Sequence, residues 1–161
     1  MDIRPATHAD LDRLMEVYEA ARQYMRREGN TVQWTNGYPS REKLASDIDN
    51  DSLYAVEQDG EVHGAFVYAL GEDEFYQTID GEWLNDEPYG TIHRVANDGA
   101  LKGMFKAALE FSKAICPNVR IDTHETNATM RHVLEKNGFK ECGIIHVADG
   151  TPRVAYQLPQ E

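Results

Sequence analysis

The sequence has few cysteines, no long run of apolar residues and no excess of basic residues. Its only two cysteines, Cys116 and Cys142, lie in unrelated segments and cannot by themselves supply the four ligands of a structural zinc site. We expect both to be buried reduced thiols. No apolar stretch approaches the roughly 20 residues of a membrane span, and the first residues lack the pattern of a signal peptide. We therefore expect a cytoplasmic protein with no metal site and no membrane partner.

Acidic residues outnumber basic ones, 28 to 16, and give the chain a formal net charge of −12. This average field repels a polyanion such as DNA, since nucleic-acid-binding proteins need basic patches that neutralise phosphates. A cationic amine is mildly attracted by the same field. The simpler interpretation, that the acidic surface only keeps the protein soluble, fits equally well. The charge therefore argues against a nucleic-acid partner without identifying a substrate.

The 161 residues are close to the commonest size of a single domain, and no repeat or linker divides them. We therefore predict one domain over residues 1–161. Its first part reads as a short strand at Ile3 and then a helix that Thr7 begins and Gly29 ends, with apolar side chains at helical spacing. Ser40 is typical of the N-cap of a second helix, which we expect to run to about Asp49.

The middle of the chain is rich in β-forming side chains. Residues 53–57 and 62–70 are separated by an Asp-Gly dipeptide, which predicts a hairpin. Residues 71–88 are acidic and aromatic with Gly and Pro breakers, and they are predicted to form a long loop or a short hairpin. Residues 89–96 are typical of a further strand.

The second half alternates between helical and strand patterns. The pattern predicts helices over 103–115 and from Asn127 to Lys136, and strands over 119–124, 139–147 and 152–158. Strands that first pair locally and then alternate with helices indicate an α/β fold with a mixed sheet flanked by helices.

Several segments together match one known pattern. Ile3–Thr7 with Asp10-Leu11 opens as a strand and a helix, and His93–Ala96 ends a later strand. Lys102–Phe105 follows it as a turn and the start of a helix, and Asn127–Phe139 is a helix that opens with Asn and ends in Gly-Phe. In this order they resemble the Gcn5-related N-acetyltransferase (GNAT) family over essentially the whole chain. The last segment is the most specific of them.

The resemblance implies an acyl-CoA N-acyltransferase fold, which is a central mixed β-sheet with a splayed strand pair, flanked by about four helices. It also implies that acetyl-CoA is the cosubstrate. A helix N-terminus with free amides and the positive end of the dipole suits the CoA pyrophosphate, and a splayed strand can pair with pantetheine as an added strand would. The residues implied to bind the cosubstrate are Val95, Ala96, Leu101, Lys102, Gly103, Met104, Phe105, Lys106 and Asn127.

Two positions depart from the family pattern. Phe105 stands where the phosphate-binding loop normally has a small residue, and Leu134 stands where many members carry a tyrosine that protonates the departing thiolate. These departures leave two alternatives open. One is a non-catalytic CoA-binding or sensor module. The other is a dimeric interaction protein that keeps only the fold and associates through exposed aromatic residues within 75–89.

Acetyl transfer to an ammonium group needs a base that removes a proton. His93 precedes Val95 by two residues, so a regular strand would put both on one face, and histidine titrates near neutral pH. His124 and Glu125 follow the next predicted strand and are further catalytic candidates. A structural role is the alternative for each of the three. Arg94 would face the other side of the sheet as an ion-pair partner for the acidic surface.

The acceptor site is the part that the resemblance implies least directly. In this family it is shaped by the first two helices, their loop and the segment before the fourth strand. Aromatic rings and carboxylates in these segments suit a cationic amine, although such aromatics also serve as packing anchors. The residues concerned are Trp34, Tyr38, Asp80, Glu82, Trp83 and Tyr89.

The sequence therefore predicts an N-acetyltransferase that moves an acetyl group from acetyl-CoA to a primary amine of a small molecule or peptide by direct attack. The expected partners are that amine and acetyl-CoA, with a homodimer as an open option. Because Leu134 cannot donate a proton, the general acid is not identified.

Overall fold

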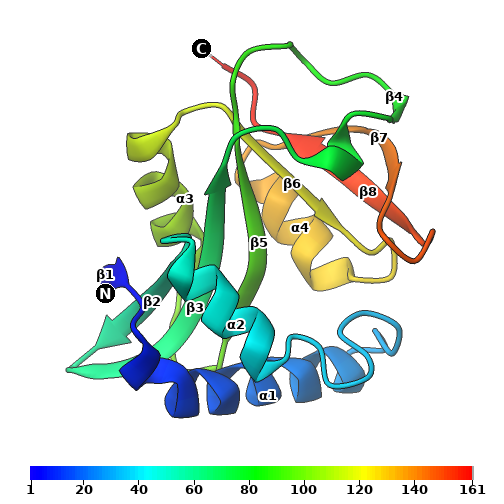
Figure 1. The fold of residues 1–161 in the computed structure, drawn as a ribbon. Helices are drawn as coiled ribbons and strands as arrows, with labels where there is room; N and C mark the ends of the chain where they lie inside the picture. Colours follow the sequence, from blue (N-terminus) through cyan, green and yellow to red (C-terminus); the bar gives the residue numbers. More distant parts are fainter. Residues whose placement is uncertain (161) are drawn as a thin grey trace. The chain divides into compact units, whose positions relative to one another are not determined.

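The computed structural model describes residues 1–160, which form two compact units (Figure 1). The first unit comprises Met1–Tyr68 and His93–Phe111, and the second comprises Ala69–Ile92 and the chain from Ser112 onward. Strands β3 (Glu61–Leu70) and β5 (Gly90–Asn97) and helix α3 (Met104–Ile115) each begin in one unit and end in the other. A single domain over residues 1–161 stays a prediction.

The first unit begins with the elements that the sequence predicts. In chain order they are β1 (Asp2–Pro5), a 3₁₀ turn (His8–Asp10), α1 (Leu11–Arg27), α2 (Arg41–Asp49), β2 (Leu53–Gln58) and β3. The side chain of Ser40 accepts a hydrogen bond from the amide of Lys43 at the start of α2, as expected of an N-cap. The Asp-Gly dipeptide joins β2 to β3 as an antiparallel hairpin.

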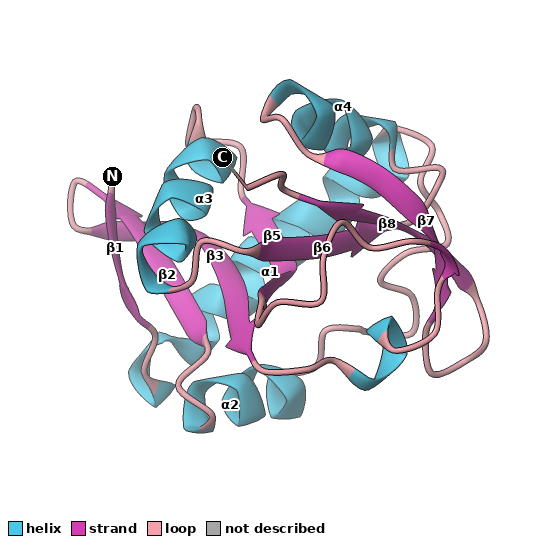
Figure 2. Ribbon diagram, turned by 90° about the horizontal axis from the view of Figure 1, so that it is seen from above, coloured by secondary structure: helices cyan, strands magenta, loops and turns pink. Residues whose placement is uncertain are grey.

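Strands β1, β2 and β3 are antiparallel neighbours, and their two faces are covered by different helices. Figure 2 shows α3 on one side of β2 and β3 and α2 on the other. On the α3 side, Phe111 packs against the rings of Tyr54 and Phe66, with centroids 4.9 and 6.2 Å away. Because side chains alternate along a strand, the neighbouring residues face α1 and α2. The core on that side is made of Leu14, Val17, Tyr18, Leu44, Ile48, Leu53, Ala55 and Val67.

The second unit holds the start of β5, a 3₁₀ turn (Glu74–Tyr76), β4 (Asp80–Gly81), β6 (Val119–Thr123), α4 (Ala128–Lys136), β7 (Lys140–His146) and β8 (Pro152–Gln157). Its strands follow the order β5-β6-β8-β7-β4. The β5–β6 pair is parallel, and the other pairs are antiparallel. Figures 1 and 2 place α4 on one side of β6 and β8 and the Glu74–Tyr76 turn on the other. The predicted fold class, α/β with a mixed sheet and about four helices, is confirmed.

Residues 71–88 form a long loop, one of the two forms predicted, and it contains the 3₁₀ turn and the two residues of β4. It is not a hairpin closed on itself, because Asp80 and Gly81 pair with Ile144 and Gly143 of β7. This approach needs two glycines, since a Cβ at Gly81 would collide with the backbone of Cys142 and one at Gly143 with the backbone of Asp80.

The sequence predicted exposed aromatic residues in this segment, but the structure buries them fully or partly. Tyr76 and Tyr89 are buried with Ile145 in a core cluster, and Phe75 and Trp83 are partly buried against it. Cys116 and Cys142 are free, and both are half-buried rather than buried. Within residues 1–160, no helix combines the length and the apolar character needed to cross a membrane.

Candidate active site

In the first unit, the loop between β5 and α3 is held by its own side chains. Oδ1 of Asn97 accepts hydrogen bonds from the amides of Gly99 and Leu101, at 2.9 and 3.4 Å, while its Nδ2 donates to the carbonyl of Leu101 at 2.8 Å. Oδ1 of Asp98 accepts from the amide of Ala100 at 2.9 Å. The loop is therefore shaped without a ligand.

Asp98 also anchors this loop to the rest of the unit. Its Oδ2 lies 2.7 Å from Nδ1 of His63 and 2.9 Å from Nη2 of Arg13. Burial of Asp98 opposes its charge, but the hydrogen bonds from His63 and the Ala100 amide, with the charges of His63 and Arg13, lower its pKa overall.

The contacts of Asp98 predict that replacing it destabilises the protein to an extent that depends on pH. Asp98→Asn should lower the free energy of unfolding by about 1–2 kcal/mol at pH 7, because it weakens charge-assisted hydrogen bonds. Since the pKa of Asp98 is lowered by folding, its carboxylate stabilises the fold fully above about pH 4, and this contribution disappears as the pH falls further. Urea unfolding at several pH values should show the difference from wild type shrinking below about pH 4. Asp59→Asn, at an exposed turn, is the control, and a pH-independent difference for Asp98→Asn would contradict the anchor.

Helix α3 begins at Met104, directly after Gly103. Gly103 has φ +70°, a backbone conformation that residues with L side chains rarely adopt. The space around its Cα is open. The first amides of an α-helix have no intrahelical acceptor, and they carry the positive end of the helix dipole. Lys102 and Lys106 flank this point and are exposed. The residues present therefore fit a phosphate group at this helix start.

The start of α3 is packed closely onto β3. A Cβ at Gly64 would lie 2.6 Å from Sδ of Met104, 3.1 Å from a methyl carbon of Leu101 and 3.1 Å from the carbonyl oxygen of Ala96. Leu101 and Met104 are both buried. The absence of a side chain at Gly64 thus lets the loop and the helix start sit against the strand.

Strand β5 is interrupted at Arg94, whose φ of +48° is left-handed. Its guanidinium donates to both oxygens of the Asp47 carboxylate, at 2.8 and 2.9 Å, and to the hydroxyl of Tyr38 at 2.9 Å. Asp47 is only 3% exposed. The hydroxyl of Tyr18 donates to the carbonyl of Arg94 at 2.6 Å, and burial raises the pKa of Tyr18, which keeps the phenol protonated. Arg94 is thus an ion-pair partner as predicted, although its partner is a buried carboxylate rather than a surface one.

Arg94 lies between His93 and Val95. Its left-handed backbone interrupts the alternation that would put these two side chains on one face of the strand. His93 and Val95 are both half-buried, and Ala96 is buried. The role of His93 as a base stays a prediction.

In the second unit, His124 lies in the turn before α4. Its Nδ1 accepts from the backbone amide of Thr126 at 3.2 Å and lies 2.8 Å from the Thr126 hydroxyl. Burial lowers the pKa of His124, and the charge of Arg153 lowers it further, against Glu125. The neutral ring then carries its proton on Nε2, and its lone pair at Nδ1 is already engaged. This geometry favours the structural alternative for His124.

Asn127 and Leu134 lie at the two ends of α4. The side chain of Asn127 accepts from the amide of Met130 at 3.1 Å, so it is the N-cap that the sequence predicts. Leu134 is fully buried and forms part of the core. Glu125 is exposed, and its carbonyl accepts from Arg131 at 3.3 Å. Contacts of Glu125 and Asn127 with substrate or cosubstrate remain predictions.

The predicted acceptor residues fall into separate groups. Trp34 is buried, with its ring 5.5 Å from that of Tyr18, and therefore acts as a packing anchor in the first unit. Tyr38 is exposed, and its hydroxyl accepts from Arg94. Asp80 and Glu82 are exposed in and after β4.

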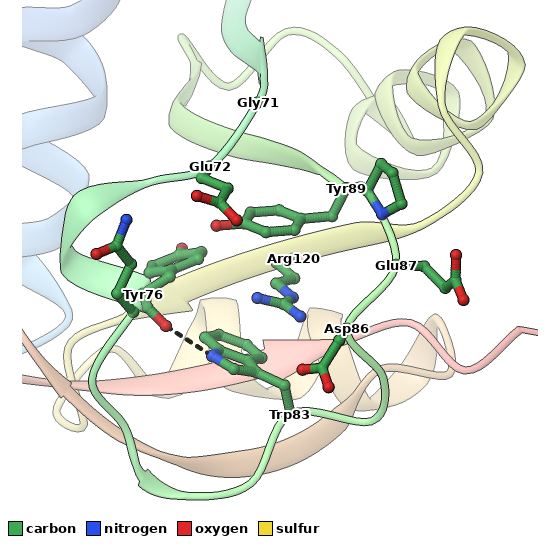
Figure 3. Close-up of a pocket in the computed structure, with 10 residues that line it drawn as sticks. Gly71, Glu72, Tyr76, Trp83, Asp86, Glu87, Tyr89 and Arg120 are labelled. Atoms are coloured by element: carbon green, nitrogen blue, oxygen red, sulfur yellow. Dashed lines mark hydrogen bonds between the residues drawn. The ribbon is translucent and has the colours of Figure 1, made fainter.

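Trp83 and Tyr89 are brought together in the second unit. Their rings lie on the two sides of the Arg120 guanidinium, as Figure 3 shows. These three residues line a cavity of about 540 Å³.

Sequence reasoning did not identify Asp47, Asn97 or Arg120. Asn97 and Asp98 precede Gly99, and side chains of this type commonly bond to amides two residues on, so a local signal existed. For Asp47 and Arg120 the partners are distant in sequence, and no local signal existed. No group of three or more His, Cys, Asp or Glu side chains placed to hold a metal occurs in the described part of the chain.

Comparison with known proteins gives matches among solved structures. No protein-family model and no curated protein matches the sequence. A GNAT-family acetyltransferase from Streptococcus agalactiae is 34% identical with a TM-score of 0.83, and the match covers 99% of this chain and 95% of that one. PaiA N-acetyltransferase from Thermoplasma acidophilum, solved in complex with coenzyme A, is 17% identical with a TM-score of 0.71 over 99% and 98%. A ribosomal-protein-alanine N-acetyltransferase from Brucella melitensis is 18% identical with a TM-score of 0.66 over 99% and 100%. The two more distant structures share the fold.

Proposed function

The chain belongs to the GNAT family of acetyltransferases, and from this premise we propose that it transfers the acetyl group of acetyl-CoA to a primary amine of a small molecule or peptide. The observation that carries the proposal is the start of α3, where a left-handed Gly103 precedes the first turn of the helix. A glycine there lets phosphate oxygens approach backbone amides closely. Lys102 and Lys106 add positive charge beside them.

We assign the binding of acetyl-CoA to two segments of the chain. The segment from Leu101 to Lys106 binds the pyrophosphate, and the backbone of Val95 and Ala96 pairs with pantetheine in the manner of an added strand. Phe105 stands where the family pattern has a small residue, and its side chain is half-buried. Because amides rather than side chains contact the phosphate, a large residue here is compatible with binding provided that it faces away from the ligand.

The reaction needs one proton removed and one carbonyl oxygen stabilised. The amine loses a proton to His93, directly or through water, and its nitrogen attacks the thioester carbonyl carbon. A C–N bond forms, the C–S bond breaks, and CoA leaves as a thiolate that takes up a proton. Backbone N–H groups stabilise the oxyanion. Since Leu134 is in the core and has no proton to give, solvent is the simplest source of the thiolate proton.

The experiment that tests this proposal is binding of acetyl-CoA by calorimetry, followed by thiol release across a panel of amines. Gly103→Val should weaken acetyl-CoA affinity at least about tenfold, because a β-branched residue is strained by roughly 1–2 kcal/mol at positive φ and crowds the phosphate. Gly29→Val is the matched control, since Gly29 also has positive φ and open space but lies after α1. It should lose similar stability and keep its affinity for acetyl-CoA.

Three outcomes decide between the alternatives. A wild-type chain without any affinity for millimolar acetyl-CoA would end the proposal. Binding without thiol release with any amine would favour a CoA-binding or sensor module, which the core position of Leu134 makes the second candidate. Unchanged acetyl-CoA affinity in Gly103→Val would mean that the phosphate binds elsewhere.

A further inference from the structure

The second unit holds a buried arginine that pairs with no carboxylate among residues 1–160. Arg120 is 4% exposed. Its Nη2 donates to the carbonyl of Asn85 at 2.8 Å, and its Nε has no hydrogen-bond partner. Among residues 1–160 it takes part in no ion pair. Burial is the largest influence on the pKa of Arg120 and lowers it, as expected where the charge is poorly solvated.

The surroundings leave only one direction of approach to this guanidinium. The centroid of the Tyr89 ring lies 3.9 Å from its central carbon, and that of Trp83 lies 4.2 Å from it. With rings lying toward both faces (Figure 3), a ligand can approach only at the edge, where the N–H donors lie in one plane. That planar set of donors matches the two oxygens of a carboxylate.

The segment that carries Trp83 and lies beside Arg120 is held by polar contacts with its surroundings. Asn118 Nδ2 donates to Oδ1 of Asn85 at 3.0 Å, and Gln157 Nε2 donates to Oδ1 of Asn118 at 2.8 Å. Oε1 of Gln157 accepts from the amide of Leu84 at 2.9 Å. The indole of Trp83 donates to the carbonyl of Tyr76 at 2.9 Å. The binding geometry around Arg120 is therefore preformed.

The rim of the same cavity carries the opposite charge. Glu72, Asp86 and Glu87 are exposed and line its opening, and Figure 3 shows the Glu72 carboxylate beside the hydroxyl of Tyr89. A ligand with only negative charge would be repelled by this rim, and one with only positive charge would be repelled by Arg120. A molecule that carries both a carboxylate and an ammonium group satisfies both. The volume, about 540 Å³, is in the range of small-molecule sites.

We propose that this cavity binds a small aminocarboxylate, such as a free amino acid, with Arg120 bound to its carboxylate and the acidic rim around its ammonium group. The proposal concerns binding within the second unit only. It does not depend on the proposed function, because binding at the cavity does not itself require acetyl transfer.

The test is calorimetry of the full chain with each proteinogenic amino acid at millimolar concentration. The best binder is then compared with two analogues, its decarboxylated amine and its deaminated acid. Both analogues should bind at least about tenfold more weakly, because each leaves one charged group of the cavity unpaired. An analogue that binds as well as the amino acid would overturn the assignment.

Variants locate the binding. Arg120→Lys keeps the charge but loses the planar donors, and Arg120→Gln loses both, so affinity should fall about tenfold or more in each. Retained acetyl-CoA binding confirms that these variants fold. Glu72→Gln, at an exposed position where folding is not at risk, should weaken the amino acid about two- to fivefold. Glu135→Gln removes an exposed charge on α4 and should change nothing, and equal effects of Glu72→Gln and Glu135→Gln would count against the rim.

The two proposals can fail separately. A chain that binds acetyl-CoA but no amino acid keeps the proposed function and loses this cavity ligand. A chain that binds an amino acid but ignores acetyl-CoA keeps the cavity ligand and loses the transferase.

Discussion

Asp47→Asn is expected to lower the free energy of unfolding by about 3–5 kcal/mol, the cost of leaving one charge of a buried pair without its partner. The Asp47 side chain accepts two hydrogen bonds from Arg94, at 2.8 and 2.9 Å, and both side chains are largely buried. Asparagine keeps the shape of the side chain but removes the charge and one acceptor. Chemical denaturation at pH 7 measures the change directly.

The same helix provides a matched control. Asp49 pairs with His8 at 2.7 Å, but both side chains are more than half exposed, so Asp49→Asn should cost less than about 1 kcal/mol. A similar cost for the two variants would mean that the Asp47–Arg94 pair is no more valuable than a surface pair. Because Arg94 is held in a left-handed conformation, loss of Asp47 should also slow catalysis by disturbing β5 next to His93.

His93→Ala is expected to lower kcat by about 10²–10⁴-fold, the range over which a positioned acid or base contributes. Its affinity for acetyl-CoA should change less than about threefold, since the phosphate contacts that we propose lie in the loop and at the start of α3. Steady-state kinetics with a saturating amine, combined with calorimetry for acetyl-CoA, separates the two effects.

The pH profile distinguishes a base from a structural histidine. In wild type, kcat/KM should fall at acid pH as the base becomes protonated, and this acidic limb should be lost in His93→Ala. His132→Ala, on the exposed side of α4, is the control and should behave as wild type. If His93→Ala is as active as wild type, the base is another group.

The fold was largely predictable because its boundaries carry local signals. Ser40 and Asn127 begin their helices by accepting hydrogen bonds from amides three residues on, and such contacts depend only on nearby residues. The hairpin at Asp59 and Gly60 depends on left-handed backbone at both positions, which these residue types tolerate. Strand β4 was missed, because its two residues are fixed by pairing with Ile144 and Gly143.

The chemical environment of the site was much less predictable, because it depends on partners far apart in the chain. An arginine in a strand gives no sign of left-handed backbone, and nothing near Arg94 indicates Asp47. Arg120 of β6 likewise lies between the rings of Trp83 and Tyr89, which belong to a segment far from it in the sequence. Composition indicated aromatic and acidic residues at 71–89, but not that the rings would be buried around a cation.

Gly64 limits which substitutions this chain can accept during evolution. Because a side chain there would meet Sδ of Met104 and the carbonyl oxygen of Ala96, a larger residue at position 64 requires Met104 to move or to be replaced by a smaller residue, and the backbone at Ala96 to shift slightly. Met104 is the first residue of α3. A substitution on β3, away from any ligand, is thereby transmitted to the helix start at which we propose that phosphate binds. Tuning of cosubstrate affinity by paired substitutions is therefore open to this chain without any change in the loop itself.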